Sequence, residues 1–484
     1  MNRPHNHKSN ERRKTVERKR IEISPGEIEN QKRIIARLRA KFEKRERPLR
    51  AFVDTYGCQQ NEADSEKIRG MLFEMGCVFT REEADADIVV INTCAVREHA
   101  EMRILGNVGA LSHTKKANKE QMIILCGCMV QAPGMAERIK KSYPYVDLVF
   151  GPQVLWRFPE LLERRLNSKK RVFEVTDEAG AIAEGLPVRR DGTVKAWLSV
   201  MYGCNNFCSY CIVPYVRMRE RSRRPEVILE EARQLVKEGY KDITLLGQNV
   251  NSYGKDLPED IDFADLIRMI NDIEGDFVIR FMTSHPKDAS EKLFKTMSEC
   301  EKAARHIHLP FQAGNNRVLK EMNRVYTREQ YLEKARLARK YMPDIVLTSD
   351  VIVGFPGETD EEFEDTVSLI EEVRFDALFT FIYSKRPGTP AAKMPDPYTR
   401  AQKQVRFDKL LDTQNRISAE KHAEYVGKTV RVLTDGRADG ETTSRTGGGR
   451  LVRIKGELPV GEYMNVKITD STTWALFGEA VAEE

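Results

Sequence analysis

Strand-like and helix-like segments alternate along most of this chain, three times over residues 49–151 and six times over residues 190–422. Short Val/Ile-rich runs, each followed by a segment with helical periodicity, are typical of parallel sheets covered by helices. The carboxyl ends of parallel strands lie at the same edge of their sheet, where open α/β sheets bind ligands. Reactive residues that directly follow such strands are therefore expected at a shared site.

In the first of these segments, one cysteine directly follows each of three predicted strands. The strand sequences are RAFVDT, DIVVINT and MIILCG, and the run DLVFG adds a last apolar stretch. Cysteines that fill a core are expected inside strands or beside helices, and we interpret Cys77, Cys126 and Cys300 in this way. The three that lie past their strands are instead predicted to form one site with three thiols: Cys58, Cys94 and Cys128.

A second set of three cysteines lies in the sequence CNNFCSYC, just after the first strand of the longer segment. Three thiolates with the spacing C-x3-C-x2-C can hold three corners of a [4Fe–4S] cube and leave the fourth iron open. A cluster that only carries electrons would take four thiolates, and a structural zinc would take four closed ligands. The spacing therefore indicates a cluster whose open iron binds a substrate, held by Cys204, Cys208 and Cys211.

Six strand–helix units are too few to close an eightfold barrel, so residues 190–422 are predicted to form a partial barrel with its site at the carboxyl ends of the strands. The segment LLGQNVNSYG leaves the second strand at that end, where Gln248 and Asn249 are placed to hold an amino-acid group. The strands are expected near residues 196–201, 242–247, 277–282, 305–310, 345–352 and 377–383.

The last residues, 424–484, change to short alternating strands separated by Gly, Asp and Pro turns, which predicts a small β-barrel. The glycine run 447–449 is expected to be a flexible loop, because no helix follows it to bind phosphate. The fold class predicted for the whole chain is therefore α/β, with a parallel amino-terminal domain, a central partial barrel and a carboxy-terminal β-barrel.

The net charge of +5 comes entirely from residues 1–48, since the rest of the chain is slightly acidic. This extension is expected to be disordered or loosely helical. The chain shows neither an apolar membrane span nor the apolar core of a secretion signal, so we expect a cytoplasmic protein. Nine cysteines in a reducing compartment indicate metal or thiol chemistry rather than disulfides.

A run of arginines, VPYVRMRERSRRP, follows the second set of cysteines. Such a run is usually a solvated charged face, but its place beside the predicted site and the neighbouring Tyr215 equally favour contact with RNA phosphates. The candidate RNA-binding residues are Arg217, Arg219, Arg221 and Arg223.

Four motifs make residues 49–484 similar to the radical SAM methylthiotransferases, a family that uses S-adenosylmethionine (SAM). They are TCAVREHAE, YGCNNFCSYCIVPYVRMRERSR, GQNVNSYG and FTFIYSKRPGTPAA. The resemblance implies a methylthiotransferase domain over 49–166, a radical SAM core over 190–422 and an RNA-binding TRAM domain over 424–484. One departure is Met218, where the family usually has glycine, which implies a less flexible loop.

The resemblance also implies two [4Fe–4S] clusters with different roles. The cluster of Cys204, Cys208 and Cys211 would bind and cleave SAM, with Tyr210, Gln248 and Asn249 in contact with it. The cluster of Cys58, Cys94 and Cys128 would carry the sulfur that is methylated by a second SAM and transferred.

Within the family, the motifs are most similar to those of enzymes that methylthiolate C2 of N6-isopentenyl(dimethylallyl)adenosine at position 37 of tRNA, next to the anticodon. Sister enzymes act on threonylcarbamoyladenosine in tRNA or on an aspartate of a ribosomal protein, and they share all six cysteines. The expected partners are the tRNA anticodon loop, an electron donor such as a flavodoxin or ferredoxin, and a sulfur or iron–sulfur assembly donor. No membrane partner is expected, and the protein is expected to be a monomer.

A function of a different class stays open from the residues alone, namely a non-catalytic iron–sulfur redox carrier or sensor with an RNA-binding tail. It would need four protein ligands for each cluster.

Overall fold

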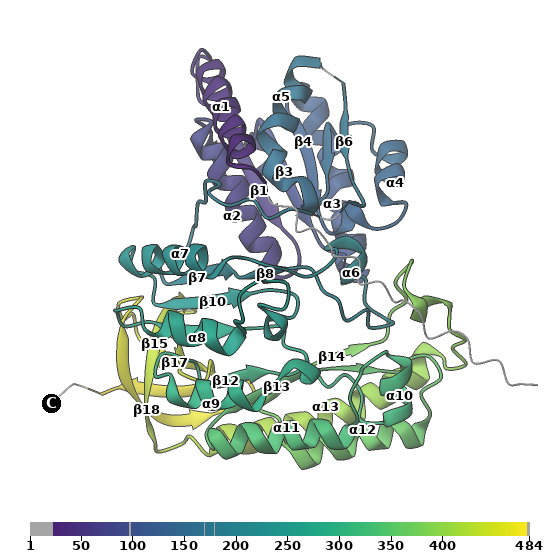
Figure 1. Ribbon diagram of the computed structural model, residues 1–484, viewed down its shortest axis with the longest axis vertical. Coiled ribbons are helices and arrows are strands. Elements are labelled where there is room, and N and C mark those ends of the chain that lie inside the picture. The colour runs from purple at the N-terminus through teal and green to yellow at the C-terminus, as the bar shows by residue number, and fades with distance from the viewer. Residues whose placement is uncertain (1–22, 96–97, 169, 179, 482–484) are drawn as a thin grey trace, which may run out of the picture.

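The computed structural model describes residues 23–95, 98–168, 170–178 and 180–481. In Figure 1 an α/β body lies above a partial barrel of strands and helices, and a small β-barrel packs at one end of that partial barrel.

The amino-terminal body contains a six-stranded parallel sheet in the order β2-β1-β3-β4-β5-β6. Its central strands β3 and β4 are buried along their whole length, because a hydrophobic core lies on each face of the sheet. The strands are β1 (Arg50–Thr55), β2 (Val78–Phe79), β3 (Ile88–Thr93), β4 (Met122–Gly127), β5 (Leu148–Phe150) and β6 (Val172–Glu174). The helices between and after them are α2 (Gln59–Glu74), α3 (Glu98–Ala117), α4 (Met135–Ser142) and α5 (Phe158–Ser168).

A further helix, α1 (Pro25–Phe42), packs against α5 and α2 (Figure 1). Ser24 and Glu27 form a capping box at its start, and Leu38 and Phe42 are buried in the core shared with the sheet. The prediction of a disordered or loosely helical extension over residues 1–48 is therefore wrong for residues 25–42, and residues 1–22 lie outside the described residues. The many charged residues of this segment lie on the exposed side of an amphipathic helix. Because they dominate the composition, the apolar residues on the buried side were not recognised as one face of a helix.

Six parallel strands form the partial barrel, as predicted. They make two three-stranded sheets, β7-β10-β11 and β12-β13-β14. Backbone hydrogen bonds join the two sheets, because Ile279 N donates to Lys302 O over 2.7 Å and Ala304 N donates to Ile279 O over 2.9 Å. The strands are β7 (Lys195–Ser199), β10 (Asp242–Leu246), β11 (Val278–Phe281), β12 (His306–His308), β13 (Val346–Val353) and β14 (Ala377–Ile382), each close to its predicted range.

Helices cover the outer face of this partial barrel and enclose the largest hydrophobic core of the described chain. A short two-stranded sheet, β8 (Met201–Tyr202) with β9 (Arg221–Ser222), closes the loop that carries the second set of cysteines. The helices are α6 (Val213–Val216), α7 (Pro225–Lys237), α8 (Phe263–Asn271), α9 (Glu291–Glu299), α10 (Asn316–Glu321), α11 (Arg328–Tyr341), α12 (Asp360–Val373) and α13 (Arg400–Ala423).

The carboxy-terminal residues form a closed five-stranded barrel in the order β15-β16-β17-β19-β18, which confirms the predicted small β-barrel. Five buried aliphatic positions, together with Leu476, fill its interior, because inward-facing positions alternate with exposed ones. Its strands are β15 (Thr429–Ala438), β16 (Glu441–Thr446), β17 (Leu451–Lys455), β18 (Tyr463–Ser471) and β19 (Leu476–Ala480).

This small barrel packs against the amino-terminal ends of the partial-barrel strands. Lys195, the first residue of β7, pairs with Asp435 over 2.6 Å. Arg450 pairs with Asp376, the residue before β14. Further contacts join Lys241 to Glu462, Arg431 to Asp276, and Arg280 to the backbone of Thr446 and Gly447.

The glycine run 447–449 belongs to this contact and is not the flexible loop that the sequence predicted. The carbonyl of Gly447 accepts a hydrogen bond from Arg280 over 3.0 Å. A Cβ atom at Gly448 would lie 2.5 Å from Cγ2 of Val346, the first residue of β13. A side chain at position 448 would collide with that of Val346, so this contact favours glycine.

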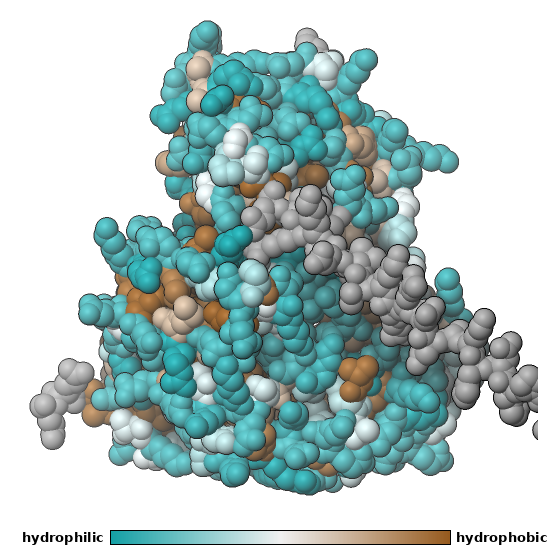
Figure 2. Space-filling view, in the orientation of Figure 1, coloured by the Kyte–Doolittle hydropathy of each residue, from teal (hydrophilic) through white to brown (hydrophobic). Residues whose placement is uncertain are grey.

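Hydrophilic side chains cover most of the face in Figure 2, and apolar ones form separate small areas. Among the helices of the described residues, none combines the length and the apolar character needed to cross a lipid bilayer.

Candidate active site

The three cysteines of the amino-terminal domain lie at the carboxyl edge of its sheet, as predicted. Cys58 precedes α2, Cys94 follows the last residue of β3, and Cys128 follows the last residue of β4. Cys128 N donates to the carbonyl of Thr93, next to Cys94, over 2.9 Å. Gly57 adopts a φ of +119°, and a Cβ atom there would lie 2.5 Å from the Cβ of Cys94. The Cys58 loop therefore passes directly over Cys94 and requires glycine at position 57.

Asn61, on the first turn of α2, holds the ends of two of these strands. Its side chain is fully buried and donates to Tyr56 O over 2.8 Å and to Thr93 O over 2.9 Å. These carbonyls belong to residues two before Cys58 and one before Cys94. Sequence reasoning missed this residue, although its place one helical turn after Cys58 was a usable signal.

Burial affects the protonation of one of these thiols, that of Cys128. It raises the pKa of Cys128 to about 12, partly offset by the neighbouring guanidinium of Arg217. Iron binds the deprotonated thiolate, which is negatively charged. When iron is bound, nearby positive charge must therefore stabilise the buried thiolate, whereas the neutral thiol needs no such charge.

The second set of cysteines lies on the loop between β8 and α6. Cys204 and Cys208 are buried, and Cys211 is partly buried. The loop returns on itself, because Cys204 N donates to Met218 O over 3.0 Å and a Cβ atom at Gly203 would lie 2.0 Å from Arg219 O. The cysteines thus lie inside a closed turn at the carboxyl end of the partial barrel, as predicted.

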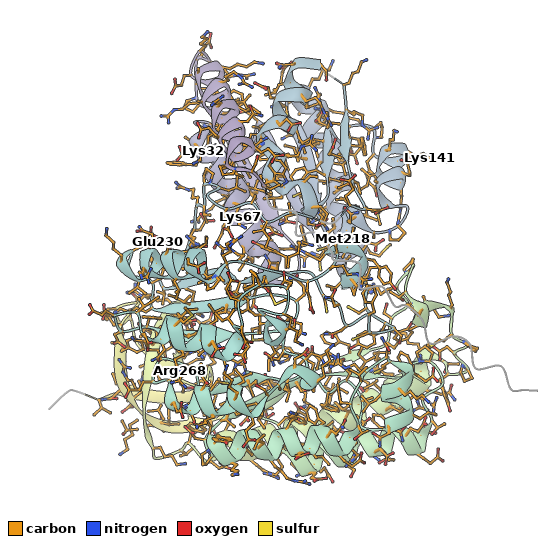
Figure 3. The ribbon with its side chains drawn as sticks, viewed as in Figure 1. Lys32, Lys67, Lys141, Met218, Glu230 and Arg268 are labelled. Atoms are coloured by element: carbon orange, nitrogen blue, oxygen red, sulfur yellow. The ribbon has the colours of Figure 1, made fainter. Side chains whose placement is uncertain are left out.

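Met218 lies on this turn with a φ of +63°, the left-handed region that glycine adopts freely. Figure 3 shows it where the partial barrel meets the amino-terminal domain. Glycine would adopt the left-handed backbone at position 218 without the steric cost that Met218 pays.

Two other segments anchor the cysteine loop. Ser209 N donates to Met322 O, at the end of α10, over 2.9 Å. Ala391 N, from the motif SKRPGTPAA, donates to Ser209 O over 2.9 Å. Arg324 is buried and donates to the sulfur of Cys208 over 3.3 Å. Sequence reasoning did not find Arg324, which lies far from the cysteine motif in the sequence.

The three predicted SAM-contacting residues have different surroundings. Gln248 accepts a hydrogen bond from Gly203 N, so it positions the cysteine loop. Asn249 is buried with its Nδ2 on Asp288, and its Oδ1 has no protein partner within the described chain. Tyr210 packs against the barrel core, and burial raises its pKa.

More polar atoms without a protein partner lie near the carboxyl ends of neighbouring strands, counting only the described residues: Ser284 Oγ, His285 Nε2 and Gln312 Oε1. Burial and the nearby Arg324 lower the pKa of His285, so its ring is neutral. Unpaired buried polar atoms are costly unless a ligand satisfies them. A ligand with amine, carboxylate and hydroxyl groups fits this set.

The arginine run is only partly available to RNA. Arg217 pairs with Asp64 over 2.7 Å, and Arg223 pairs with Glu184 and Glu231 over 2.7 and 2.8 Å. Both arginines are buried, so the prediction that they contact RNA is wrong for these two.

Arg219 is exposed, with its guanidinium 4.1 Å from the ring centroid of Phe207. Arg221 is partly buried, which lowers its pKa to about 10. Among the four candidate RNA-binding arginines, these two are the ones that solvent reaches.

The two three-cysteine sites lie side by side. Cys128 and Ala95, the residue after Cys94, pack in one hydrophobic cluster with Ile212, the residue after Cys211, and Val216. The amino-terminal domain and the partial barrel therefore meet at the residues that flank both sets of cysteines.

No group of three His, Cys, Asp or Glu side chains in the described chain has the arrangement of a single-metal site. A cubane cluster binds each thiolate through a different iron, so its thiols must lie further apart than the ligands of one ion. The donor sets, three thiols each, fit clusters of this kind.

Three family models match the chain. The Radical SAM superfamily covers residues 198–370, the Uncharacterized protein family UPF0004 covers residues 50–151, and the TRAM domain covers residues 423–481. A solved radical SAM methyltransferase, TsrM from Kitasatospora setae, has the same fold with a TM-score of 0.53 and 13% identity, over 71% of this chain and 75% of that one. The fold and the paired cysteine sites thus define a radical SAM protein with a second three-cysteine domain and a TRAM domain.

Curated relatives narrow this class. A tRNA-2-methylthio-N(6)-dimethylallyladenosine synthase from Thermoanaerobacter sp. (strain X514) is 50% identical over 95% of this chain and 98% of its own length. Enzymes of the same name from Acetivibrio thermocellus and Clostridium perfringens are 49% and 50% identical over 96% and 89% of this chain, and over 99% and 97% of their own. The chain belongs to the family of tRNA-2-methylthio-N(6)-dimethylallyladenosine synthases.

Proposed function

We propose that this protein methylthiolates C2 of N6-isopentenyl(dimethylallyl)adenosine at position 37 of tRNA. The observation that carries the proposal is the identity of about half of all residues, over nearly the whole chain, to enzymes named for this product. The TRAM domain supports an RNA substrate.

The cysteines are proposed to hold two [4Fe–4S] clusters, each with one open iron. Cys58, Cys94 and Cys128 would hold one cluster, and Cys204, Cys208 and Cys211 the other. In the described chain, no further cysteine follows a strand end at either site, and the sulfur of Cys126 lies 3.8 Å from Ile91 O within the sheet. This favours open clusters over the four-ligand clusters of a redox carrier.

The reaction explains why two such sites are needed. The C2–H bond of adenine is nonpolar, and an acid or base of ordinary strength does not activate it. When bound, the clusters and two SAM molecules would supply the 5′-deoxyadenosyl radical that removes this hydrogen and the methylated sulfur that replaces it.

The chain's own residues position these groups. Asn249, Ser284, His285 and Gln312 present unpaired polar atoms toward the proposed SAM site, while Gln248 fixes the cysteine loop. Arg219 and Arg221 are the arginines proposed to meet tRNA phosphates. Bases in single-stranded loops can be unstacked into such a pocket.

In this proposal, residues 49–166 form the methylthiotransferase domain, residues 190–422 form the radical SAM core, and residues 424–484 form the TRAM domain. We include a flavodoxin or ferredoxin as electron donor, a sulfur or iron–sulfur assembly donor, and a monomeric cytoplasmic enzyme in the proposal.

Mass spectrometry of nucleosides from tRNA tests the substrate. A strain that lacks the gene should accumulate N6-isopentenyladenosine, and complementation should restore its 2-methylthio form. If threonylcarbamoyladenosine loses its methylthio group instead, the sister tRNA activity is correct. If both nucleosides stay unchanged, a ribosomal-protein substrate or a redox carrier has to be considered in place of this proposal.

A further inference from the structure

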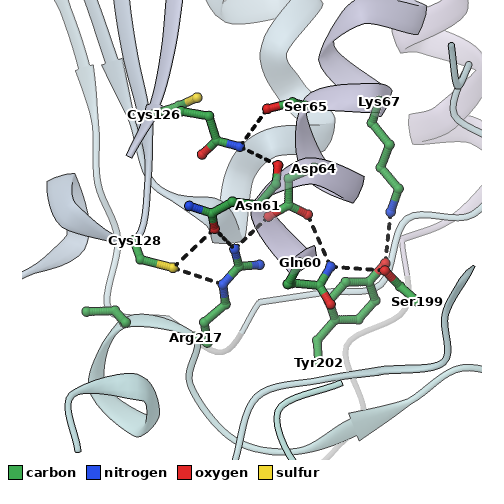
Figure 4. A network of polar contacts seen from close by, with 12 residues as sticks. Gln60, Asn61, Asp64, Ser65, Lys67, Cys126, Cys128, Ser199, Tyr202 and Arg217 are labelled. Carbon is green, nitrogen blue, oxygen red and sulfur yellow. Dashed lines mark hydrogen bonds and ion pairs between the residues drawn. The ribbon is translucent and has the colours of Figure 1, made fainter. Parts of the chain in front are cut away.

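Arg217 belongs to the segment that follows the radical SAM cysteines, yet its side chain ends in the amino-terminal cysteine site (Figure 4). Its Nε–H donates to the sulfur of Cys128 over 3.0 Å. Its Nη2 donates to Asn61 Oδ1 over 2.6 Å and lies 2.7 Å from Asp64 Oδ2. One guanidinium thus contacts a predicted cluster ligand and two residues of α2.

The whole group is almost completely buried. Arg217, Asp64 and Cys128 are each 5% exposed, and Asn61 is 0% exposed. A buried guanidinium is stable only when its charge is paired and its donors are satisfied. Asp64 supplies the charge and Asn61 an acceptor, so the direction of the Nε–H bond to Cys128 is fixed.

The position of Arg217 also determines the charge beside the sulfur. The reduction potential of an iron–sulfur cluster depends on nearby charge and on hydrogen bonds to its sulfurs. Reduction adds one negative charge to the cluster. A donor N–H and a positive charge stabilise the reduced form, whereas the carboxylate of Asp64 opposes it.

We propose that Arg217 is a positioning residue that orients Cys128 and raises the reduction potential of the amino-terminal cluster. The inference rests on the proposed function, because it takes Cys58, Cys94 and Cys128 as cluster ligands. It means that the radical SAM core supplies part of the environment of the other cluster, through a residue six positions after Cys211.

The test uses the full-length chain with Cys204, Cys208 and Cys211 changed to Ala, so that only the amino-terminal cluster is left. Iron is quantified after anaerobic reconstitution, and the cluster potential is measured by redox titration followed by electron paramagnetic resonance. Three changes are compared in this background: Arg217→Met, Asp64→Asn and, as a matched control from the same arginine run, Arg219→Met.

Arg217→Met should shift the potential downward, because the N–H donor is lost and Asp64 is left without its cation. Asp64→Asn should shift it upward, because Arg217 keeps its place and one negative charge is removed. Arg219→Met should leave it unchanged, since Arg219 lies at the surface on Phe207. A merely structural ion pair would not give shifts of opposite sign.

The iron content and the cluster potential test different assignments. If the background protein holds no iron, the assignment of the amino-terminal cysteines in the proposed function is wrong. If it holds iron and the potential does not move in Asp64→Asn, or moves the same way in both variants, the role of Arg217 is wrong. Should Arg217→Met not fold, Asp64→Asn still decides, because it retains the arginine.

Discussion

Arg324 donates a hydrogen bond to the sulfur of Cys208 over 3.3 Å. The same guanidinium donates to Pro310 O over 2.7 Å and to the hydroxyl of Tyr326 over 3.0 Å. Each set of cysteines therefore has one buried arginine against one of its sulfurs, and in both sets that arginine is distant in sequence from the cysteine it contacts.

Arg324→Met should impair the radical SAM site selectively. Loss of the donor to Cys208 should reduce SAM cleavage by roughly 10- to 100-fold, the usual cost of removing a residue that orients a metal ligand. The measurement is 5′-deoxyadenosine formed by the reduced enzyme. Arg336→Met, at an exposed position on α11, is the control and should cleave SAM normally. Normal cleavage by Arg324→Met would show that the contact with Cys208 has no functional role.

Iron content tests the assignment of the two cysteine sets. The reconstituted protein should hold about eight irons, and changing either set of three cysteines to Ala should leave about four. Changing Cys77 and Cys300, which lie in hydrophobic cores, should leave the iron content unchanged. An amino-terminal triple variant with full iron would remove that set as cluster ligands.

Product analysis separates the roles of the sites. Without Cys58, Cys94 and Cys128, the protein should still cleave SAM to 5′-deoxyadenosine but should not methylthiolate tRNA. Without Cys204, Cys208 and Cys211, both reactions should stop. Methylthiolation at a normal rate by the amino-terminal variant would contradict the proposed sulfur-carrying role.

Helix α1 is expected to contribute to the stability of the amino-terminal domain. Leu38 is 1% exposed, so Leu38→Ala should lower the free energy of unfolding by roughly 2–5 kcal/mol. Thermal unfolding followed by circular dichroism measures this, with Lys32→Ala as the control on the exposed side of the same helix (Figure 3). An unchanged midpoint in Leu38→Ala would show that α1 is not part of the cooperative unit.

Glu358 should make stability depend on pH. Burial raises its pKa to about 7, although Gly354 N donates to its carboxylate over 2.7 Å. The folded protein therefore binds this proton more tightly than the unfolded chain does. Its stabilising contribution is fully present below about pH 4.5 and is lost as the pH rises to about 7, by about 3 kcal/mol at most.

Glu358→Gln should remove this dependence. Relative to the original protein, the variant should gain stability between pH 5 and pH 8, as measured by unfolding midpoints at both values. Glu361→Gln, on the exposed side of α12, is the control. A constant difference between Glu358→Gln and the original protein across this range would contradict the raised pKa.

The sequence predicted the strands and the cysteine positions because both are local signals. Val/Ile-rich runs mark buried parallel strands, and cysteines placed just after them lie at the sheet edge whatever the loops do. The buried roles of Arg217 and Arg223 could not be predicted, because Asp64, the partner of Arg217, and Glu184, one partner of Arg223, are distant in sequence. The sequence of a charged run does not show which carboxylates the fold places beside it.

The packing of the small barrel was equally hidden, since it depends on complementary surfaces rather than on periodicity. Gly448 fits against Val346 only because two domains meet there. The glycine run signalled a special backbone, but the sequence did not show what approaches it.

The small barrel packs at the amino-terminal ends of the partial-barrel strands, and the loop with Cys204, Cys208 and Cys211 lies at their carboxyl ends. These strands are three to eight residues long, and the longest, β13, spans about 26 Å. A tRNA that touches the small barrel while its base enters the site must bridge roughly that depth. The enzyme would then select RNAs by the distance between the modified nucleotide and the part of the RNA that contacts the small barrel. A short anticodon-loop fragment could enter the active site without contacting the small barrel.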